Sequence, residues 1–518
     1  MKLQVSIFVY IIFLFSCGSS KNIYESRLSF ISFDKFEKNP EEIDDNKRLQ
    51  RAVIYCRDNN VDTLFFPKGE YEFYHTRMWP GQVFLGEEGT VFKKRPMSGK
   101  WARMFTTKAK YLGDEDSEMI VFKNITFDGN KDKQGPYKKY QLQQQHILFF
   151  DADPRSKGRL RAHVENCTFQ NSVADGITTY KNAFLTVKNC KAFNVFRGGV
   201  VGGGGNSRIE IDGLETGGED DMTGIDIEVD GKGSNGKLDI YIVAKNMIIA
   251  GDFDVGLHDG STFIGDNIQV TKPKIHIKGY GSKIKISNSY FNLGDKAKIN
   301  RIFFPKDIHF DNCKFDYVGN SEGGFSGLNI YFETSYYKEP DHTLKFTNCK
   351  FYAKNNKFKN IIALTDIQNS HHVETNRIII DNCSFEGEFN KVLQARKGGN
   401  LEIYNSYMEA DKILHINTIR LRSKFILKGD FILLNDKTSV FVEHKHPNKA
   451  DDISLTGGLI FVENRSKDFQ LGDLSLPVLP KRRKVNGNYV KVGNKRVQEF
   501  YQFDARGNKY SKKQIRNN

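Results

Sequence analysis

The sequence predicts an all-β protein built as a single parallel β-solenoid, in which the chain winds through coils that stack on one another. A short motif recurs along the chain: an apolar residue, a spacer, an asparagine, a small residue or cysteine, and an aromatic residue. Neighbouring copies are often 21 to 24 residues apart, as from Asn166 to Asn189 and from Asn382 to Asn405. Such a period, with short alternating strands and little helical patterning, indicates one coil per repeat.

The repeat also predicts which residues stack. Its copies are FKNITF (122–127), VENCTF (164–169), VKNCKAF (187–193), ISNSYF (286–291), FDNCKF (310–315), FTNCKF (346–351), IDNCSF (380–385) and IYNSYM (403–408). Coils of a parallel solenoid lie about 4.8 Å apart, so equivalent residues form columns, which we call ladders. We expect the asparagines to hydrogen-bond along a corner and the cysteines and aromatic residues to stack inside. Since the chain has no CxxC pair, buried thiols are favoured over a metal cluster.

Residues 1–16 predict an export signal. One lysine precedes an apolar run of about a dozen residues, which is short for a membrane span. The following LFSC-GSSKN resembles the lipobox of bacterial lipoproteins, in which Cys17 becomes the lipidated first residue of the mature chain. The resemblance implies a palmitate-bearing lipid anchor, a linker over residues 17–29 and a location at the outer membrane or cell surface. An ordinary signal peptide with an incidental cysteine is the alternative.

Residues 44–73 predict how the solenoid begins. A helix with Leu49, Ala52, Val53 and Cys56 on one face precedes a strand and the turn PKGEY (67–71). This resembles the opening of right-handed parallel β-helix proteins of the pectate-lyase-like superfamily, and the resemblance covers roughly residues 30–465. It implies a right-handed β-helix whose N-terminal helix caps the open edge of the first coil. The superfamily includes polysaccharide lyases, glycoside hydrolases, epimerases and phage tailspikes, so the fold alone does not choose an activity.

The charge of the chain bears on its partner. The formal net charge is +14, and much of the excess lies in residues 466–518, which we expect to form a basic tail or cap. For an exported protein, a positive charge favours an anionic polysaccharide or a cell surface over nucleic acid. We expect a monomer.

When the strands of successive coils are aligned, residues with chemically active side chains fall next to one another. The strands compared are GITTY (176–180), GVVGG (199–203), GIDIE (224–228), GLHDG (256–260) and KIHIK (274–278). We align as an inward ladder Ile177, Val200, Ile225, Leu257 and Ile275. The adjacent outward ladder is then Thr178, Val201, Asp226, His258 and His276, and the next one is Tyr180, Gly203, Glu228, Gly260 and Lys278. Asp226 would lie one coil from His258, and Glu228 would face a gap between two glycines.

These residue types predict chemistry on an acidic sugar. The candidate catalytic residues are His258, Asp226, Glu228, Tyr180, His276 and Lys278, with Arg197 as a substrate-binding residue. Elimination at a uronic acid needs donors on the carboxylate, a base for the neighbouring C–H and often an acid for the leaving oxygen. Because basic donors outnumber acid pairs on the predicted face, we expect a carbon–oxygen lyase. It would act by β-elimination on a uronate-containing polysaccharide or oligosaccharide, through chain cleavage or loss of water.

Two alternatives stay open. Asp226 and Glu228 are about 6.5 to 7 Å apart along a strand at Cα, which is compatible with an inverting glycoside hydrolase of an anionic or sulfated polysaccharide. Iota-carrageenases, which are also β-helical, are similar in placing paired acids on one strand. A non-catalytic surface protein that binds glycans would need only the basic surface and the aromatic residues.

Two further groups are secondary candidates. Asp220 and Asp221, in the acidic run GGEDDMTG (217–224), could join Asp252 as oxygen ligands for calcium, although an acidic turn without an ion is the alternative. No cofactor is required by the pattern. Farther along the chain, Gln394 and Arg396 are expected to extend a sugar-binding groove.

Overall fold

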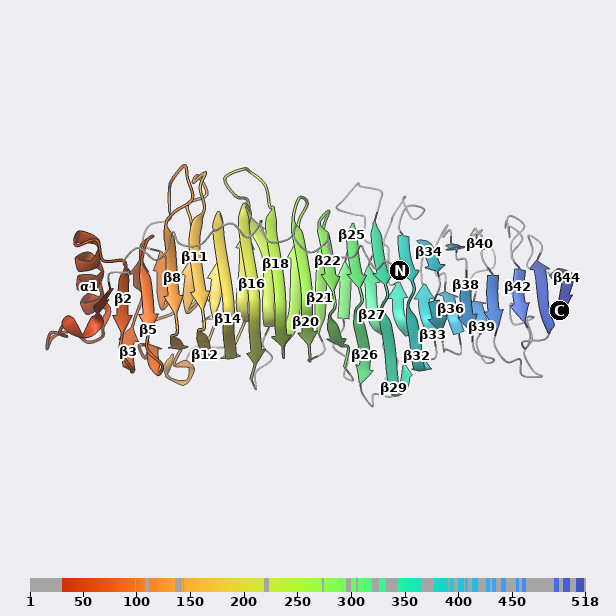
Figure 1. The fold of residues 1–518 in the computed structure, drawn as a ribbon, viewed down its shortest axis with the longest axis horizontal. Coiled ribbons are helices and arrows are strands. Elements are labelled where there is room, and N and C mark those ends of the chain that lie inside the picture. Colours follow the sequence, from red (N-terminus) through yellow and green to blue (C-terminus); the bar gives the residue numbers. More distant parts are fainter. Residues whose placement is uncertain are drawn as a thin grey trace, which may run out of the picture.

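The computed structural model is an elongated right-handed parallel β-helix with one α-helix at its N-terminal end (Figure 1). It describes residues 30–364, except for 98, 108–110, 136–141, 143, 219–222, 273, 295–299, 304–305, 319–325, 332–341 and 359. From 377 to 516 it describes the strands and a few residues between them. Cys17 and the predicted export signal lie outside the described residues, so they stay predictions. No helix in the described part is long and apolar enough to cross a membrane.

Each coil contributes one strand to sheet B, whose members pair in parallel from coil to coil. Its strands are β4 (Thr76–Met78), β7 (Phe105–Thr107), β10 (Leu148–Phe150), β13 (Ile177–Thr179), β15 (Gly198–Gly204), β17 (Thr223–Gly231), β19 (Asp252–Leu257), β21 (Ile275–Gly279), β24 (Asn300–Phe303), β27 (Ser326–Tyr331), β30 (Asn360–Leu364), β33 (Lys391–Ala395), β36 (Lys412–Asn417) and β39 (Ser439–Glu443).

The rest of each coil forms two rows of sheet A, which meet at a corner. The first row holds β1 (Phe30–Ser32), β2 (Thr63–Phe66), β5 (Val83–Gly86), β8 (Met119–Lys123), β11 (Leu160–Glu165), β22 (Lys283–Ser287), β25 (Asp307–Asp311), β28 (Thr343–Thr347), β31 (Arg377–Asp381), β34 (Gly399–Tyr404), β37 (Phe425–Lys428) and β40 (Ile453–Leu455). The second row holds β3 (Gly69–Phe73), β6 (Thr90–Lys94), β9 (Thr126–Asp128), β12 (Thr168–Ser172), β23 (Tyr290–Asn292), β26 (Lys314–Val318), β29 (Lys350–Phe358), β32 (Ser384–Phe389), β35 (Ser406–Met408), β38 (Phe431–Leu434) and β41 (Leu459–Val462). Long strands run through both rows in four coils: β14 (Ala183–Val195), β16 (Ser207–Gly217), β18 (Ile240–Ile249) and β20 (Thr262–Val270).

The two ends of the solenoid differ. At the N-terminal end, η1 (Phe33–Lys35) and the helix α1 (Asn46–Asp58) precede the first coil, and Leu49 and Ala52 are buried against it. The Tyr71 hydroxyl donates a hydrogen bond of 3.0 Å to the Pro67 carbonyl and closes the predicted PKGEY turn. At the other end, β42 (Tyr489–Val492) extends sheet A in parallel, while β43 (Val497–Phe503) and β44 (Lys509–Arg516) pair antiparallel. A second short helix, η2, spans Lys131–Lys133.

The corner between the two rows confirms the predicted asparagine ladder. Asn348 and Asn382 have φ angles of 55° and 51°, the left-handed conformation that asparagine tolerates better than most residues. The Asn382 amide donates to the Asn348 side-chain oxygen at 2.7 Å, and the Asn348 amide donates to Asp311 at 3.0 Å. The same contact joins Asn312 to Asn288 at 2.7 Å. The corner side chains therefore hydrogen-bond to one another from one coil to the next.

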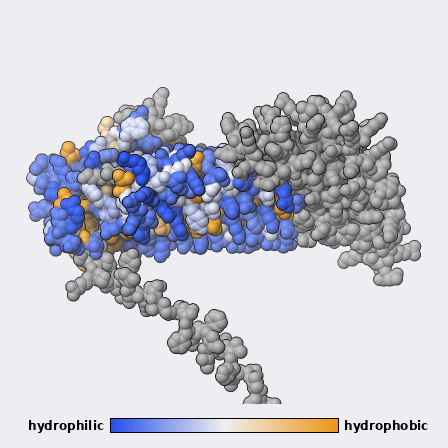
Figure 2. Space-filling model, turned by 90° about the horizontal axis from the view of Figure 1, so that it is seen from above, coloured by the Kyte–Doolittle hydropathy of each residue, from blue (hydrophilic) through white to orange (hydrophobic). Residues whose placement is uncertain are grey.

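The interior confirms the predicted stacks. Five cysteines are buried and free beside the corner, namely Cys167, Cys190, Cys313, Cys349 and Cys383. The rings of Phe351 and Phe385 stack with centroids 4.4 Å apart and planes 2° apart. The described surface in Figure 2 is mainly hydrophilic, with small, separate apolar areas. This distribution is expected of a solenoid whose apolar side chains point inward.

Candidate active site

The outward face of sheet B carries the candidate site, and its register corrects one predicted coil. Asp226 on β17 pairs with Asp254 on β19, which pairs with His276 on β21. Asp254 therefore takes the place predicted for His258, and Phe253 takes the inward place predicted for Leu257. The prediction was wrong by four residues. An even slip keeps every side chain on its own face, so the alternating hydrophobic pattern could not detect it.

The corrected outward ladder changes character along the solenoid. In order, it consists of Thr178, Val201, Asp226, Asp254, His276 and Arg301. The adjacent ladder contains Glu228, Gly256, Lys278 and Phe303, so Gly256 replaces the predicted Gly260. On the other side, β15 and β17 change register beyond Gly202. The predicted grouping of Asp226, Glu228, His276 and Lys278 is confirmed, and Asp254 joins it.

Three carboxylates form the centre of the site. Asp226, Glu228 and Asp254 each place one oxygen within 4.8 Å of the others. The side chains of Asp226 and Asp254 are 15% and 17% exposed, whereas that of Glu228 is 48% exposed. One oxygen of Asp226 and one of Asp254 are buried without a hydrogen-bond partner. We call these three residues the acid cluster.

The environment of Asp226 favours its protonated form. Burial, reinforced by the charges of Glu228 and Asp254, raises the pKa of Asp226 to about 7. Arg197 opposes this shift, since its Nη2 lies 3.8 Å from Asp226 Oδ2. Near neutral pH the cluster therefore holds a proton on a carboxyl group that lies beside other carboxylates. This is the arrangement that separates an acid from a base among chemically similar groups.

Basic side chains hold the other two carboxylates. His276 Nδ1 lies 3.0 Å from Asp254 Oδ2, and Lys278 Nζ donates to Glu228 Oε1 at 3.1 Å. The Lys278–Glu228 bond joins strands that are two coils apart and passes over Gly256, which has no side chain to block it. Burial alone would lower the pKa of Lys278, but Asp254 and Glu228 raise it, so the ammonium stays charged.

A buried group behind the cluster was not predicted. The Asp175 side chain is fully buried, with Oδ2 2.7 Å from His146 Nδ1 and Oδ1 3.5 Å from Arg197 Nε. The Thr178 hydroxyl donates to Asp175 at 3.1 Å. Burial lowers the pKa of His146, although Asp175 opposes the shift. Asp175 and His146 precede strands in irregular segments, where no repeat or periodicity marks them. Their contacts hold Arg197 against Asp226.

Some predicted residues lie at the edge of the site. His258 follows the end of β19 and stacks on Tyr280, with centroids 5.3 Å apart. Burial lowers the pKa of His258, while Asp230 opposes that shift. Tyr180 follows β13, and its ring lies against Gly203, where an added Cβ would come within 3.1 Å of the ring. His258 therefore does not belong to the outward ladder that contains Asp226, whereas Tyr180 lies beside Gly203 as the register predicts.

The calcium site predicted at Asp220, Asp221 and Asp252 stays a prediction, because two of its three residues are not described. Asp252 forms an ion pair with Lys274, and Asp220 and Asp221 lie outside the described residues. Among the described residues, the acid cluster is instead the group that could hold a cation. Calcium takes six to eight oxygens, so three carboxylates fit only as part of its ligand set.

The predicted groove residues are only partly described. Gln394 lies in β33, where its backbone pairs with Ala363 and His415, which continues the strand ladder of Asp226. Arg396 lies outside the described residues.

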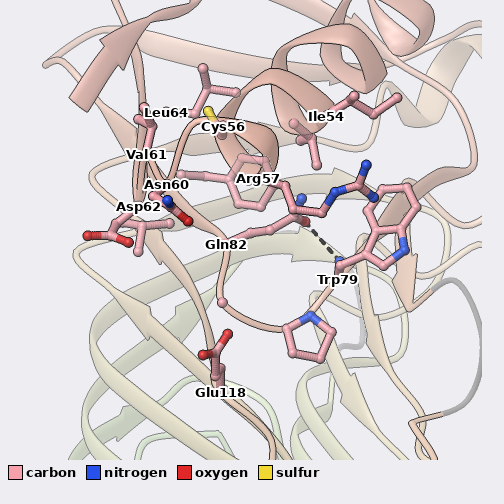
Figure 3. Close-up of a pocket in the computed structure, with 15 residues that line it drawn as sticks. Ile54, Cys56, Arg57, Asn60, Val61, Asp62, Leu64, Trp79, Gln82 and Glu118 are labelled. Atoms are coloured by element: carbon pink, nitrogen blue, oxygen red, sulfur yellow. Dashed lines mark hydrogen bonds between the residues drawn. The ribbon is translucent and has the colours of Figure 1, made fainter. Parts of the chain in front are cut away.

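A separate cavity of about 490 Å³ lies at the N-terminal end, far from these groups along the chain. α1 and the segment around β2 and β5 line it, and Figure 3 shows Trp79 and Arg57 together on one wall, with Asp62 and Glu118 on the other. The Trp79 backbone N–H donates to the Gln82 side chain at 2.8 Å. None of its lining residues belongs to the acid cluster, so we place the candidate active site on sheet B.

Comparisons with known proteins find only distant likenesses to solved structures. No family model and no curated protein matches the sequence. The solved structures with a similar fold include the mannuronan C-5 epimerase A-module of Azotobacter vinelandii, with 12% identity over 88% of this chain and 100% of that chain and a TM-score of 0.31. They also include an exopolygalacturonase of Thermotoga maritima (10% identity, 94% of each chain, TM-score 0.34) and a surface adhesin of Streptococcus pneumoniae (12% identity, 94% of this chain, 98% of that chain, TM-score 0.28). The chain is a right-handed parallel β-helix by its own strand arrangement, and these distant likenesses carry no argument about its family or its activity.

Proposed function

We propose that this protein is a carbohydrate-active enzyme that hydrolyses a glycosidic bond in an anionic polysaccharide, with the acid cluster as its catalytic centre. The observation that carries the proposal is the position of Asp226. Its pKa of about 7 leaves a substantial fraction of its carboxyl group protonated near neutral pH, and one of its oxygens lies within 4.8 Å of those of Asp254 and Glu228. Glycoside hydrolysis needs such a pair, a protonated carboxyl and an ionised one.

The roles follow from the surroundings of each group. Asp226 would protonate the glycosidic oxygen, because its pKa is raised. Asp254 would be the partner that attacks, because His276 Nδ1 orients its Oδ2 at 3.0 Å and its Oδ1 is left without a hydrogen bond among the described residues. Glu228 and Lys278 are more suited to orienting the sugar, since Glu228 is the most exposed member of the cluster. Arg197 holds Asp226 in place from behind.

The oxygen spacing bears on stereochemistry. Inverting enzymes place their carboxyl groups roughly 6.5 to 9.5 Å apart to admit a water, whereas retaining enzymes place them about 5 to 5.5 Å apart. A closest approach within 4.8 Å is nearer to the retaining range. The proposal therefore includes direct attack of Asp254 on the sugar, followed by hydrolysis of the glycosyl-enzyme, in place of the inverting Asp226–Glu228 pair.

A second candidate is β-elimination at a uronate, which the His276–Asp254 pair favours. His276 would remove the proton beside the sugar carboxylate, the carbon–oxygen bond would break, and Asp226 would protonate the leaving oxygen. Arg197 and Lys278 supply positive charge for the carboxylate, and calcium held by Glu228 and Asp254 would add to it while Asp226 carries the proton. We place elimination second because Asp254, and not His258, occupies the ladder beside Asp226, so acids now outnumber histidines there.

One experiment separates these candidates. The full chain would be incubated with pectate, alginate, ulvan and glycosaminoglycans, with and without a calcium chelator. New reducing ends and the ultraviolet absorbance of unsaturated uronates would both be measured. Reducing ends without absorbance support hydrolysis, and reducing ends with absorbance support elimination. Neither signal on any substrate would contradict both and favour a glycan-binding protein.

A further inference from the structure

The outward ladder of sheet B changes from acidic to basic immediately beyond the acid cluster. His276 follows Asp254, and Arg301 on β24 follows His276. In the adjacent ladder, Lys278 is followed by Phe303. Side chains in neighbouring places of a ladder are about 4.8 Å apart, so Arg301 lies on the order of 10 Å from Asp254 along the solenoid.

Arg301 has no anionic partner within the part of the chain that the structure describes. Its side chain is partly buried, and its Nε–H is fully buried without a hydrogen-bond acceptor. By contrast, Arg197 is held between Asp175 and Asp226, and Arg377 is bound by Glu402. A buried donor left without an acceptor costs about 1 to 3 kcal/mol, and more when the group is charged. An arginine in this state is suited to binding an anion that arrives with a ligand.

The neighbours of Arg301 complete a surface for a sugar. The His276 ring is held at Nδ1 by Asp254 and lies edge-on to the Phe303 ring, with centroids 5.3 Å apart and planes 66° apart. Phe303 and Arg301 are two residues apart on one strand, so both lie on the same face of sheet B. An aromatic ring beside a guanidinium suits a molecule that has an apolar face and a charged edge, such as a pyranose carrying a carboxylate or sulfate.

We propose that Arg301, His276 and Phe303 form a binding subsite for an anionic sugar, adjacent to the acid cluster on its C-terminal side. This inference rests on the proposed action on polysaccharides and identifies where the substrate's charge is recognised. The charge is bound beyond His276, so it belongs to a sugar next to the one whose bond is cleaved.

The test is binding to a protein whose turnover of the substrate is strongly reduced. Titration calorimetry would be performed on the full chain carrying Asp226→Asn, with and without Arg301→Ala. The probes are oligogalacturonate, its neutral methyl ester and a sulfated galactan oligosaccharide. We expect Arg301→Ala to weaken binding of at least one anionic probe tenfold or more, to reduce its salt dependence, and to leave binding of the ester unchanged. The anionic probe that loses more affinity identifies the group as carboxylate or sulfate.

Arg161→Ala is the matched control. Arg161 also has a buried Nε without a partner, but it lies on β11 in sheet A. We expect this variant to bind all probes as the parent does, and circular dichroism would verify the fold of both variants. Unchanged anionic binding in Arg301→Ala, an equal loss on the neutral ester, an equal loss in Arg161→Ala or no binding of either anionic probe would overturn the inference.

The two proposals fail differently. Binding that depends on Arg301 without cleavage of any polysaccharide would remove the enzymatic proposal and leave the subsite in place. Cleavage of an anionic polysaccharide that Arg301→Ala does not affect would keep the enzymatic proposal and remove the subsite.

Discussion

The corner ladder of sheet A and the outward ladder of sheet B use the same stacking for opposite purposes. At the corner, Asn312 binds Asn288 and Asn382 binds Asn348, so nearly identical residues satisfy one another. On sheet B, the residue type changes from Val201 to Asp226 to His276, and buried oxygens lack partners. Where successive coils carry the same residue type, the stacked side chains stabilise the solenoid. Where the residue type changes, polar groups lack partners and a ligand can supply the missing contacts.

The largest expected effect is the loss of the acid in the cluster. Asp226→Asn removes the proton donor but keeps the shape, so activity should fall about 10²- to 10⁴-fold, the usual contribution of general acid–base catalysis. Reducing-end release on the preferred polysaccharide would measure it. Glu210→Gln, which alters an outward carboxylate on sheet A paired with Arg208, is the control and should retain full activity. Equal losses in both variants would contradict the site.

The next effect concerns the corner. Asn348→Ala removes hydrogen bonds to Asp311 and from Asn382 and places alanine at a φ of 55°. The free energy of unfolding should fall by about 2 to 4 kcal/mol, from two hydrogen bonds and left-handed strain. Asn348→Gly relieves the strain and should cost less. Chemical denaturation would measure both variants, and equal stability of the alanine and glycine variants would remove the backbone argument.

In the acid cluster, by contrast, a substitution should raise the free energy of unfolding, by an amount that depends on pH. The folded pKa of Asp226, about 7, lies above the unfolded value of 3.8, so the folded state binds more protons and stability falls as pH rises from about 4 to 7. Asp226→Asn has no carboxyl group to ionise there, so the variant should not lose stability as the pH rises. At pH 8 the variant should be more stable than the parent by about 2 to 4 kcal/mol, from roughly 1.4 kcal/mol per pKa unit. Near pH 4 the gain should vanish. Unfolding at both pH values would measure it, and a gain independent of pH would contradict the raised pKa.

The smallest effect tests the gap over Gly256. An alanine there would place its Cβ 3.6 Å from the Lys278 side chain and 3.1 Å from the Ile227 carbonyl, which the backbone tolerates with slight movement. We expect Gly256→Ala to raise KM at most a few-fold, because the small backbone movement away from the Ile227 carbonyl shifts the Lys278–Glu228 pair slightly, with kcat nearly unchanged. Steady-state kinetics would show it, and a fall in kcat alone would contradict an orienting role for the pair.

The prediction from sequence succeeded where residues repeat and failed where they do not. Cys349 and Phe351 were placed inside by a motif that occurs in coil after coil, so any one copy checks the others. Asp254 was missed because β19 could slide by four residues without exposing an apolar side chain. Asp175 was missed because it precedes a strand, where alternation has not begun.

The sequence by itself determined the solenoid, its corner asparagines, its buried thiols and the presence of carboxylates on the outward face of β17. These follow from local periodicity, which is written in consecutive residues. Only the tertiary structure decided that Asp254 lies beside Asp226, that Lys278 reaches Glu228 across Gly256, and that Arg301 has no anionic partner among the described residues. Each of these depends on how one coil is registered on the next, and backbone hydrogen bonds between parallel strands are the same for every even shift. The loops that set the register are irregular, so their length does not reveal the pairing in advance.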